Sequence, residues 1–490
     1  RDRRINFDQQ ENMSLQLGSA QDQNAWSEGN QWTINSFFSR VNYTFANKYV
    51  IEGTIRADGS SRFDPDHRWG WFPGVNAAWR VGEEGFMKRL GWFEDLKVRA
   101  SYGEMGNQSG IGLYDYIQLI SLSNDYYPFG AGVKGQMATS GNIISTSRTW
   151  ETIQTTNVGF DFSTLNNRLY GSFDYFWKEN KNMLIPKTYP SMLGADAPST
   201  NSGHLSIHGW EISLGWRDQI KDFSYSVRFN ISDAKNKVVD RVGSNLIKLG
   251  NNETPTGYPL NSYFGYEFDG IIQNEQELEA YKSRFSEGGI PGDLSVGDAM
   301  YKDLDGDGKL SVLGDGKEGS GDVKYLGDKN PRYNFGFNLS MAWKGFDLSA
   351  FIQGVGRRTM FLEGESRCPM PEAWYQSAEY WYGKTWTPER TDAQYPAITL
   401  KDKRNYNYYV STNTKFNVAY ARLKNLQFGY TIPQTLTSKA GLQKVRVYFS
   451  GEDLFEVHNT PNGWDPEENS GSITSYPFTR NYSFGINVVF

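Results

Sequence analysis

A two-residue alternation of apolar and polar side chains is the feature that most constrains this chain. From Tyr482 to Phe490 every second residue is apolar, and the residues between them are polar except for Val489. Successive side chains of a β-strand point to opposite faces, so this segment predicts a strand with one apolar and one polar face. Such a strand suits the closing strand of a barrel and equally the edge strand of a soluble sandwich.

The same alternation returns along the chain and predicts 13 strands. These are residues 37–45, 49–57, 75–80, 96–102, 156–162, 169–177, 210–217, 223–232, 333–343, 346–353, 423–432, 445–449 and the terminal strand within 478–490. Alternation alone does not separate the two architectures, because a sandwich also buries one face of each sheet. Aromatic residues at the strand ends and charge on the opposite face favour a transmembrane antiparallel β-barrel.

The connections between these strands alternate in length. Short ones fall near 46–48, 218–222 and 344–345, whereas residues 233–330 and 357–416 form the longest connections. Short turns at one end and long extracellular loops at the other are typical of outer-membrane barrels. Residues 258–272 have a strand-like pattern, but one more spanning strand would break this parity. We therefore expect them to lie within an ordered outer loop.

Composition agrees with a membrane barrel and excludes some other classes. Aromatic residues make up 15% of the 490 residues, with 30 Tyr and 15 Trp, as interfacial belts require. No apolar run approaches the roughly 18 residues of a membrane helix. The net charge of −6 without basic stripes argues against nucleic-acid binding. Cys368 is the only cysteine, so no disulfide forms within the chain.

The segment 303–315 contains the strongest signal for a bound ion. Its start, Asp-Leu-Asp-Gly-Asp-Gly, matches the first half of a calcium loop, in which alternate carboxylates converge on one hard cation. A glutamate is expected at the twelfth position, but Gly314 stands there, and Asp322 lies further on. The alternative is a plain Asp/Gly turn. The predicted structural Ca²⁺ ligands are Asp303, Asp305, Asp307, Lys309 through its carbonyl group, Ser311 and Asp315.

An aromatic cluster in the second long loop is a candidate contact surface. Aromatic platforms stack on sugars or clamp peptides, but they also pack a loop against itself or against a partner. The cluster consists of Trp374, Tyr375, Tyr380, Trp381, Tyr382 and Trp386. No catalytic constellation can be argued from four scattered histidines, and we expect no enzymatic activity.

A dozen short motifs, in order, carry a family resemblance over nearly the whole chain. They include RVNYTFANKYVIEGTIRADGSSRF, GWFPGVNAAWRV, LKVRASYGEMGNQ, TWETIQTTNVGFDF, GYPLNSYFGYEFDGII, DLDGDGKL, NPRYNFGFNLSMAWKGFDLSAFIQG, LKNLQFGY, VYFSGEDLF and NGWDPE. On these motifs the chain resembles the C-terminal part of a SusC/RagA-type TonB-linked outer-membrane protein of Bacteroidetes. The terminal Phe490 resembles the outer-membrane assembly signal of this family.

The resemblance implies a 22-stranded barrel with an N-terminal plug, energised by TonB with ExbB and ExbD. It also implies a SusD-like surface lipoprotein that covers the barrel, usually as a dimer of SusC–SusD pairs. Imported ligands in this family are oligosaccharides or oligopeptides. The acidic loop matches the family at Asp303, Asp305, Asp307 and Gly308.

We therefore expect residues 1–490 to form the C-terminal portion of the barrel, about 13 or 14 strands in contact with membrane lipid. The chain begins RDRR without a signal peptide, and we expect the plug domain and TonB box to lie in an N-terminal part of the same protein. The predicted function is nutrient import across the outer membrane. The alternative is a surface β-protein that binds glycan or peptide without transporting it.

Overall fold

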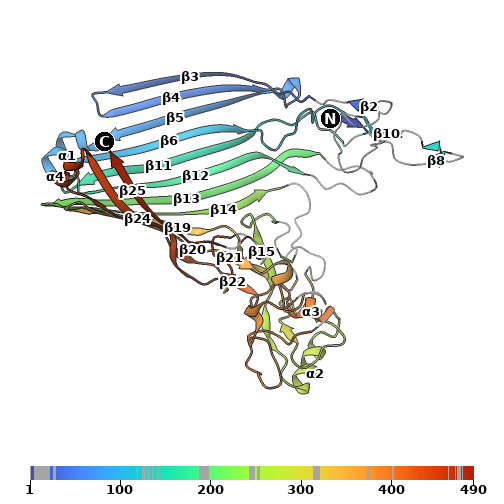
Figure 1. Cartoon of the computed structure of the whole chain (residues 1–490). Helices are drawn as coiled ribbons and strands as arrows, with labels where there is room; N and C mark the ends of the chain where they lie inside the picture. Colours follow the sequence, from blue (N-terminus) through green and yellow to red (C-terminus); the bar gives the residue numbers. More distant parts are fainter. Residues whose placement is uncertain are drawn as a thin grey trace.

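One antiparallel sheet of 13 strands dominates the computed structural model (Figure 1). The structure describes residues 2–4, 23–25, 29–118, 120–123, 128–129, 133–134, 137–140, 143–186, 192, 198–241, 249–250, 254–312, 321–371, 376–399, 402–461, 463–468, 471, 476 and 478–490. Within these residues the sheet contains β3 (Ile34–Phe45), β4 (Tyr49–Ser60), β5 (Trp69–Arg80), β6 (Asp95–Asn107), β11 (Glu151–Thr164), β12 (Leu169–Pro186), β13 (Ser199–Ile220), β14 (Phe223–Asp240), β19 (Arg332–Trp343), β20 (Phe346–Arg357), β23 (Tyr420–Thr431), β24 (Lys444–His458) and β25 (Asn481–Val489). The 13 predicted strands are confirmed.

Each strand between β3 and β25 pairs with the spanning strands before and after it, so spatial order follows chain order. The register keeps side chains of one kind on one face. Phe160 of β11 lies opposite Val98 and Phe173, while its neighbour Asp161 lies opposite Lys97 and Ser172. A slip of one residue would turn the apolar row to the polar face, so the alternation itself specifies the register.

The apolar face is exposed and ends in aromatic rows. At one end of the first strands Phe37 stacks on Trp69, with ring centroids 5.9 Å apart. At the other end Tyr49 stacks on Phe45 and Trp79, each with centroids 6.4 Å away. Eight residues separate Phe37 from Phe45, which is about 26 Å along a strand. This spacing matches the apolar band of roughly 25 Å that outer-membrane barrels present to lipid.

The opposite face carries ion pairs between strands. The Arg99 guanidinium lies 2.9 Å from Asp161 Oδ1 and 3.0 Å from Asp174 Oδ2, which links β6, β11 and β12. Arg446 of β24 is paired in the same way with Asp347 of β20, at 2.5 Å. Charges of this density are costly against hydrocarbon, so this face is the wet lumen side of the wall.

The predicted parity of the connections is confirmed. At one end most strands are joined by short segments, and one of the two-residue connections is Lys344–Gly345, with φ of 46° and 90°. Positive φ at both central residues produces a hairpin turn whose twist suits the flanking strands, and glycine adopts it without strain. At the other end lie the long connections, including 241–331 and 358–419. We call these the turn end and the loop end.

Several strands continue past their predicted limits at the loop end. The strand predicted at 210–217 spans Ser199–Ile220, and β14 continues to Asp240. Residues 233–240 therefore belong to the wall and not to the long loop predicted from residue 233. The physical reason is that strands emerging from the membrane have water on both faces, so the apolar alternation ends while the hydrogen-bonded ladder continues. Residues 258–272 lie in the outer loop, as predicted.

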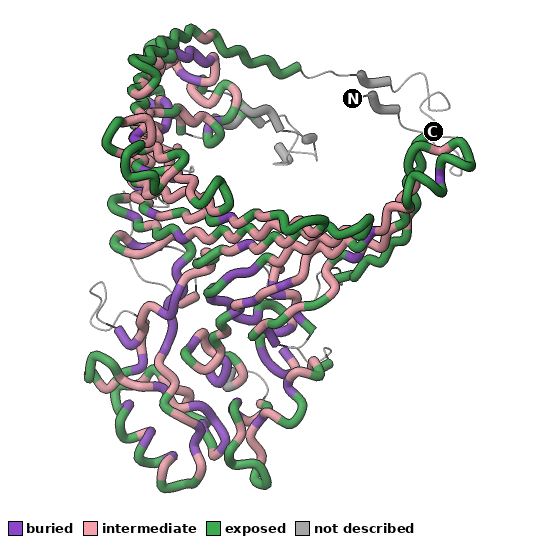
Figure 2. Tube along the Cα trace, turned by 90° about the vertical axis from the view of Figure 1, so that its left-hand side faces the viewer, coloured by how far each residue is buried: buried purple, intermediate pink, exposed green. Residues whose placement is uncertain are grey.

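The sheet is an open arc when viewed from the turn end (Figure 2). Among the described strands, β3 and β25 each have a single neighbour and form its two edges. None of the helices in the described ranges is long and apolar enough to span a bilayer.

The remaining elements are short. They are β1 (Asp2–Arg4), β2 (Gln23–Ala25), β7 (Ile120–Ser123), β8 (Pro128–Phe129), β9 (Val133–Lys134), β10 (Met137–Ser140), β15 (Ser262–Tyr266), β16 (Phe268–Ile271), β17 (Ala299–Tyr301), β18 (Val323–Asp328), β21 (Thr359–Phe361), β22 (Lys415–Asn417), α1 (Gly85–Leu90), α2 (Glu275–Arg284), α3 (Asp402–Asn407) and α4 (Gln434–Thr437). Those from β15 to β18, together with β21, β22, α2 and α3, lie at the loop end of the sheet (Figure 1).

The assignment of the two faces can be tested on adjacent residues of β11. Val158 lies on the apolar face and Asn157 on the polar face. We expect Val158→Arg to lower the free energy of unfolding in lipid vesicles by about 2–4 kcal/mol, the cost of arginine near the bilayer midplane. Guanidinium titration gives this value, with Asn157→Arg as the matched control. Equal losses in the two variants would contradict the assignment.

Candidate functional site

The two long connections, 241–331 and 358–419, fold together into one outer lobe (lower part of Figure 1). Backbone hydrogen bonds cross between them. Tyr266 N donates to Val410 O at 3.0 Å, and Thr412 N donates to Tyr266 O at 3.1 Å. Ala397 N likewise donates to Gly297 O at 2.8 Å. The two loops are therefore joined by backbone hydrogen bonds into a single unit at the loop end of the wall.

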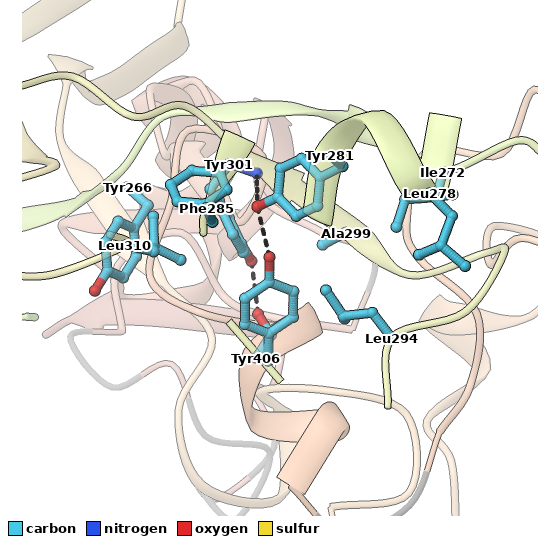
Figure 3. Close-up of a cluster of buried hydrophobic side chains, with 10 residues drawn as sticks. All are labelled: Tyr266, Ile272, Leu278, Tyr281, Phe285, Leu294, Ala299, Tyr301, Leu310 and Tyr406. Atoms are coloured by element: carbon cyan, nitrogen blue, oxygen red, sulfur yellow. Dashed lines mark hydrogen bonds between the residues drawn. The ribbon is translucent and has the colours of Figure 1, made fainter. Parts of the chain in front are cut away.

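The lobe has its own apolar core (Figure 3). This core joins nine residues of the first connection to Tyr406 of the second. Its buried members are Tyr266, Ile272, Leu278, Tyr281, Phe285, Leu294, Ala299, Tyr301, Leu310 and Tyr406. The removal of these apolar side chains from water makes the main favourable contribution to the folding free energy of the lobe.

Three tyrosine hydroxyl groups are hydrogen-bonded inside this core (Figure 3). The hydroxyl oxygens of Tyr281 and Tyr406 lie 2.6 Å apart, and Tyr301 N donates to Tyr281 Oη at 2.9 Å. The Tyr301 hydroxyl donates to the carbonyl oxygen of Tyr406 at 2.8 Å. Burial raises the pKa of Tyr281 to about 12 and keeps that of Tyr301 well above its usual value. The network is therefore neutral at physiological pH and needs no counter-ion.

A buried amide makes a second link between the loops. Asn407 in α3 donates from Nδ2 to Asp298 Oδ1 at 2.9 Å, and its Oδ1 accepts from Ala299 N at 2.9 Å. Asp298 and Asn407 are both fully or nearly fully buried. Removing one partner would leave a buried polar group unsatisfied, which is costly, so this contact fixes α3 against the first connection.

The predicted aromatic cluster is divided by the structure. Trp381 is buried in a second apolar core, and the hydroxyl of Tyr380 lies 2.6 Å from that of Tyr395. Trp386 donates from Nε1 to Gln273 Oε1 at 3.1 Å. Tyr382, in contrast, is 90% exposed. Three of the six aromatic residues thus make packing contacts within the lobe, and Tyr382 faces solvent; Trp374 and Tyr375 lie outside the described residues.

The acidic loop is compact, and its carboxylates converge. One oxygen from each of Asp303, Asp305 and Asp322 lies within 4.8 Å of the others. Asp303 accepts from Gly306 N at 2.7 Å and Gly308 N at 3.0 Å, which curls the loop around its carboxylate. Both glycines have φ of 75°, a conformation that side chains disfavour.

Among the described carboxylates, Asp307 is a predicted ligand that is not in this converging group. Asp307 Oδ1 accepts from Lys309 N at 2.8 Å, and Ser311 N donates to Asp322 Oδ2 at 2.8 Å. Asp315 lies outside the described residues. Asp322 was not among the predicted ligands, because its position 19 residues after Asp303 follows no loop spacing. Only the fold of the lobe brings it to the site.

Electrostatics at this cluster favour a cation. Burial raises the pKa of Asp322, and the carboxylates of Asp305 and Asp303 add repulsion. Burial also raises the pKa of Asp305, again with repulsion from neighbouring aspartates. A bound divalent cation would remove this repulsion, and oxygen ligands of this kind suit Ca²⁺.

The outer lobe is also tied to the barrel wall through residues 463–468. The buried Arg422 of β23 lies 2.7 Å from Asp465 Oδ1 and 3.3 Å from Glu467 Oε1. Arg358, directly after β20, donates to the carbonyl oxygens of Pro466 and Glu468 at 2.7 Å each. Trp464 of the same segment packs in the second apolar core. The segment 463–468 therefore contacts both the wall and the lobe. It contains most of the NGWDPE motif.

An ion pair in the lobe allows a pH test. Glu267 lies 2.7 Å from Lys302 Nζ and is also paired with Lys324. Hydrogen bonds from Lys302 and Lys324 lower the pKa of Glu267 from 4.5 to about 2. A lowered pKa in the folded state means that the pair stabilises the lobe above pH 4.5 and loses this effect as the pH falls towards 2.

We expect Glu267→Gln to lower the thermal unfolding midpoint of the lobe at pH 7, with the difference from wild type shrinking as the pH falls below 4.5. Scanning calorimetry at several pH values measures this. Glu279→Gln is the control, because Glu279 is exposed and its nearest cation, Lys282, is 3.9 Å away. A difference that stays constant down to pH 2 would contradict the assignment.

Comparison with known proteins agrees with the fold. Residues 3–454 match the family model described as TonB dependent receptor-like, beta-barrel. TonB-dependent receptor P3 of Formosa agariphila is 32% identical, over 94% of this chain and 46% of that protein. TonB-dependent receptor SusC of Bacteroides thetaiotaomicron is 27% identical, over 94% of this chain and 44% of that protein. The chain thus spans about half the length of the curated relatives it matches.

A solved structure shows the same fold. The structure described as the RagAB peptide transporter superposes with a TM-score of 0.77 at 23% identity, over 98% of this chain and 50% of that chain. The likeness covers both the curved wall and the outer connections, since almost the whole chain takes part in it.

Proposed function

This chain belongs to the TonB-dependent receptor β-barrel family, and from that membership we propose that it forms the C-terminal wall and outer lobe of a nutrient importer of the outer membrane. The observation that carries the proposal is the wall itself. It has an apolar face with aromatic rows about 26 Å apart, an ion-paired face, and its longest connections all at one end.

The proposed mechanism is passage without covalent chemistry. The ligand, an oligosaccharide or an oligopeptide, is captured at the loop end, where the outer lobe stands, and is released into the periplasm at the turn end. Energy comes from TonB with ExbB and ExbD, which act on a plug in the N-terminal part of the same protein. The similarity to TonB-dependent receptors supports a transport role and not an enzymatic one.

The proposed partner at the loop end is a SusD-like lipoprotein that covers the barrel, assembled as a dimer of pairs. The described residues of the lobe suit such a partner because they already hold one another in place. Its two loops are held by tyrosine hydroxyls, a buried amide and the segment 463–468, so little conformational entropy is lost when a partner binds. Tyr382 presents an exposed aromatic ring on this lobe.

Purification of the native full-length protein in detergent, followed by intact mass and peptide mapping of every chain, tests the proposal. We expect a plug-bearing N-terminal part and a SusD-like lipoprotein to copurify, and ligand uptake by whole cells to stop when TonB is deleted. Recovery of the chain alone and soluble without detergent would favour the alternative, a surface β-protein that binds glycan or peptide without transport.

We also propose that the acidic loop holds one structural Ca²⁺ ion. The sequence motif and the convergence of Asp303, Asp305 and Asp322 support this proposal. In this arrangement Asp322 joins the ligands that the sequence predicts. The ion would connect the segment 303–311 to the residues just before β18, and so brace the first connection of the lobe.

Replacement of a single exposed ligand tests the ion site. Asp305→Asn removes a charge from the cluster but keeps an oxygen that can accept from Asp307 N. We expect Ca²⁺ binding, measured by isothermal titration of the full-length protein, to weaken about tenfold or more, since affinity follows the number of charged ligands. The control is Asp269→Asn, because Asp269 pairs with Arg284 outside the cluster. Equal affinities for wild type and Asp305→Asn would contradict the site.

A further inference from the structure

One connection at the turn end differs from the tight hairpins beside it. Residues 81–94 join β5 to β6 and include the short helix α1. Three large apolar side chains in this segment are exposed: Phe86 by 54%, Leu90 by 50% and Trp92 by 66%. Phe86 and Leu90 are four residues apart and so share one face of the helix. Three exposed large apolar side chains are a high proportion for a connection of 14 residues.

The start of this segment is fastened to the apolar face of the wall. Glu84, directly before α1, accepts from Tyr49 Oη at 2.7 Å and from Trp79 Nε1 at 3.2 Å. Lys48 Nζ adds a third contact at 2.9 Å. Tyr49 and Trp79 belong to the aromatic row at the turn end of the apolar face. The helix therefore begins beside the row that marks the membrane boundary.

The end of the segment is fastened on the same side. Phe93 packs edge-on against Phe162, which continues the apolar row of β11, with ring centroids 6.3 Å apart. Thr164 donates from Oγ1 to Trp92 O, and Glu94 N donates to Ser163 O at 2.9 Å. Both ends of the connection are thus held at the lipid side of the wall, and the exposed side chains lie between them.

The charges in the segment complement a phospholipid surface. Lys88 and Arg89 occupy the last turn of α1. Lys88 Nζ is paired with Glu83 at 2.6 Å, whereas Arg89 is exposed and has no ion pair within the part of the chain that the structure describes. A cation next to exposed apolar side chains is the pattern of a helix that lies in a membrane interface.

We propose that residues 85–92 form an interfacial anchor seated in the phospholipids of the inner leaflet. Phe86, Leu90 and Trp92 lie among the upper acyl carbons, and Arg89 contacts a lipid phosphate group. The anchor fixes the depth and tilt of the wall on the β5–β6 side. This inference rests on the proposed location in the outer membrane, but it is independent of what the protein imports.

Depth-dependent quenching tests the anchor in the full-length receptor. Leu90→Cys, labelled with a small fluorophore, is reconstituted in phosphatidylethanolamine–phosphatidylglycerol vesicles that contain phospholipids with a doxyl quencher on an upper or a lower acyl carbon. Cys368 is buried and does not compete for the label. We expect the upper quencher to act at least about twofold more strongly than the lower one, because interfacial helices lie near the headgroup–acyl boundary.

Two further labels separate failure of the anchor from failure of the membrane placement. Ile51→Cys, on the apolar face of β4, should be quenched by lipid, and Tyr382→Cys, on the outer lobe, should not. Quenching at Ile51 but none at Leu90 would overturn the anchor alone. Absence of quenching at both Ile51 and Leu90 would overturn the membrane placement together with the anchor.

A charge variant tests the phosphate contact. Native mass spectrometry of the detergent-purified receptor measures retained phosphatidylglycerol, with Arg89→Gln compared with wild type. We expect retention to fall about fivefold, the effect of one basic residue at an anionic lipid surface. Lys439→Gln is the control, because Lys439 lies at the turn end in a different connection. Equal retention in wild type and Arg89→Gln would overturn the phosphate assignment.

Discussion

The rest of this structure depends on the antiparallel hydrogen-bond ladder of its wall. Lipid offers no partners for backbone N–H and C=O groups, so each spanning strand must satisfy them on its neighbours. The ladder also fixes the register, and the register decides which side chains meet lipid. The register that places Phe160 between Val98 and Phe173 also places Asp161 between Lys97 and Ser172. One pairing scheme therefore creates both the lipid surface and the ion-paired lumen surface.

The two ends of the strands, where water returns, are stabilised in different ways. At the turn end the connections are mostly short, and the aromatic row of Tyr49 and Trp79 holds the segment before α1 through Glu84. At the loop end, the backbone groups of the two long connections form hydrogen bonds with each other within the outer lobe. The Tyr281–Tyr406 hydroxyl pair and the Asn407–Asp298 contact join two loops that the wall strands β19 and β20 separate in sequence. Arg422 and Arg358 then connect the lobe to the wall through residues 463–468.

Much of the wall could be predicted because its signal is local. A period of two over five or more residues identifies a strand, and the parity of the connections places the long loops at one end. The residues at which the strands begin and end were harder to predict. β14 continues to Asp240 with Asp233, Lys235 and Lys237 on its outer part, a stretch whose polarity is that of a loop. Its hydrogen bonds to β13 make it a strand, and no side-chain pattern records them.

By itself, the sequence determined the strands of the wall, their faces, the length parity of the connections and the acidic motif, because each depends on residues close together in the chain. Only the tertiary structure decided which loop residues meet. It buried Trp381 and exposed Tyr382, its direct neighbour, and it brought Asp322 to Asp303. It also paired Tyr406 with Tyr281 across 125 residues. The physical reason is that burial and convergence depend on contacts between segments, which no periodicity of a single segment encodes.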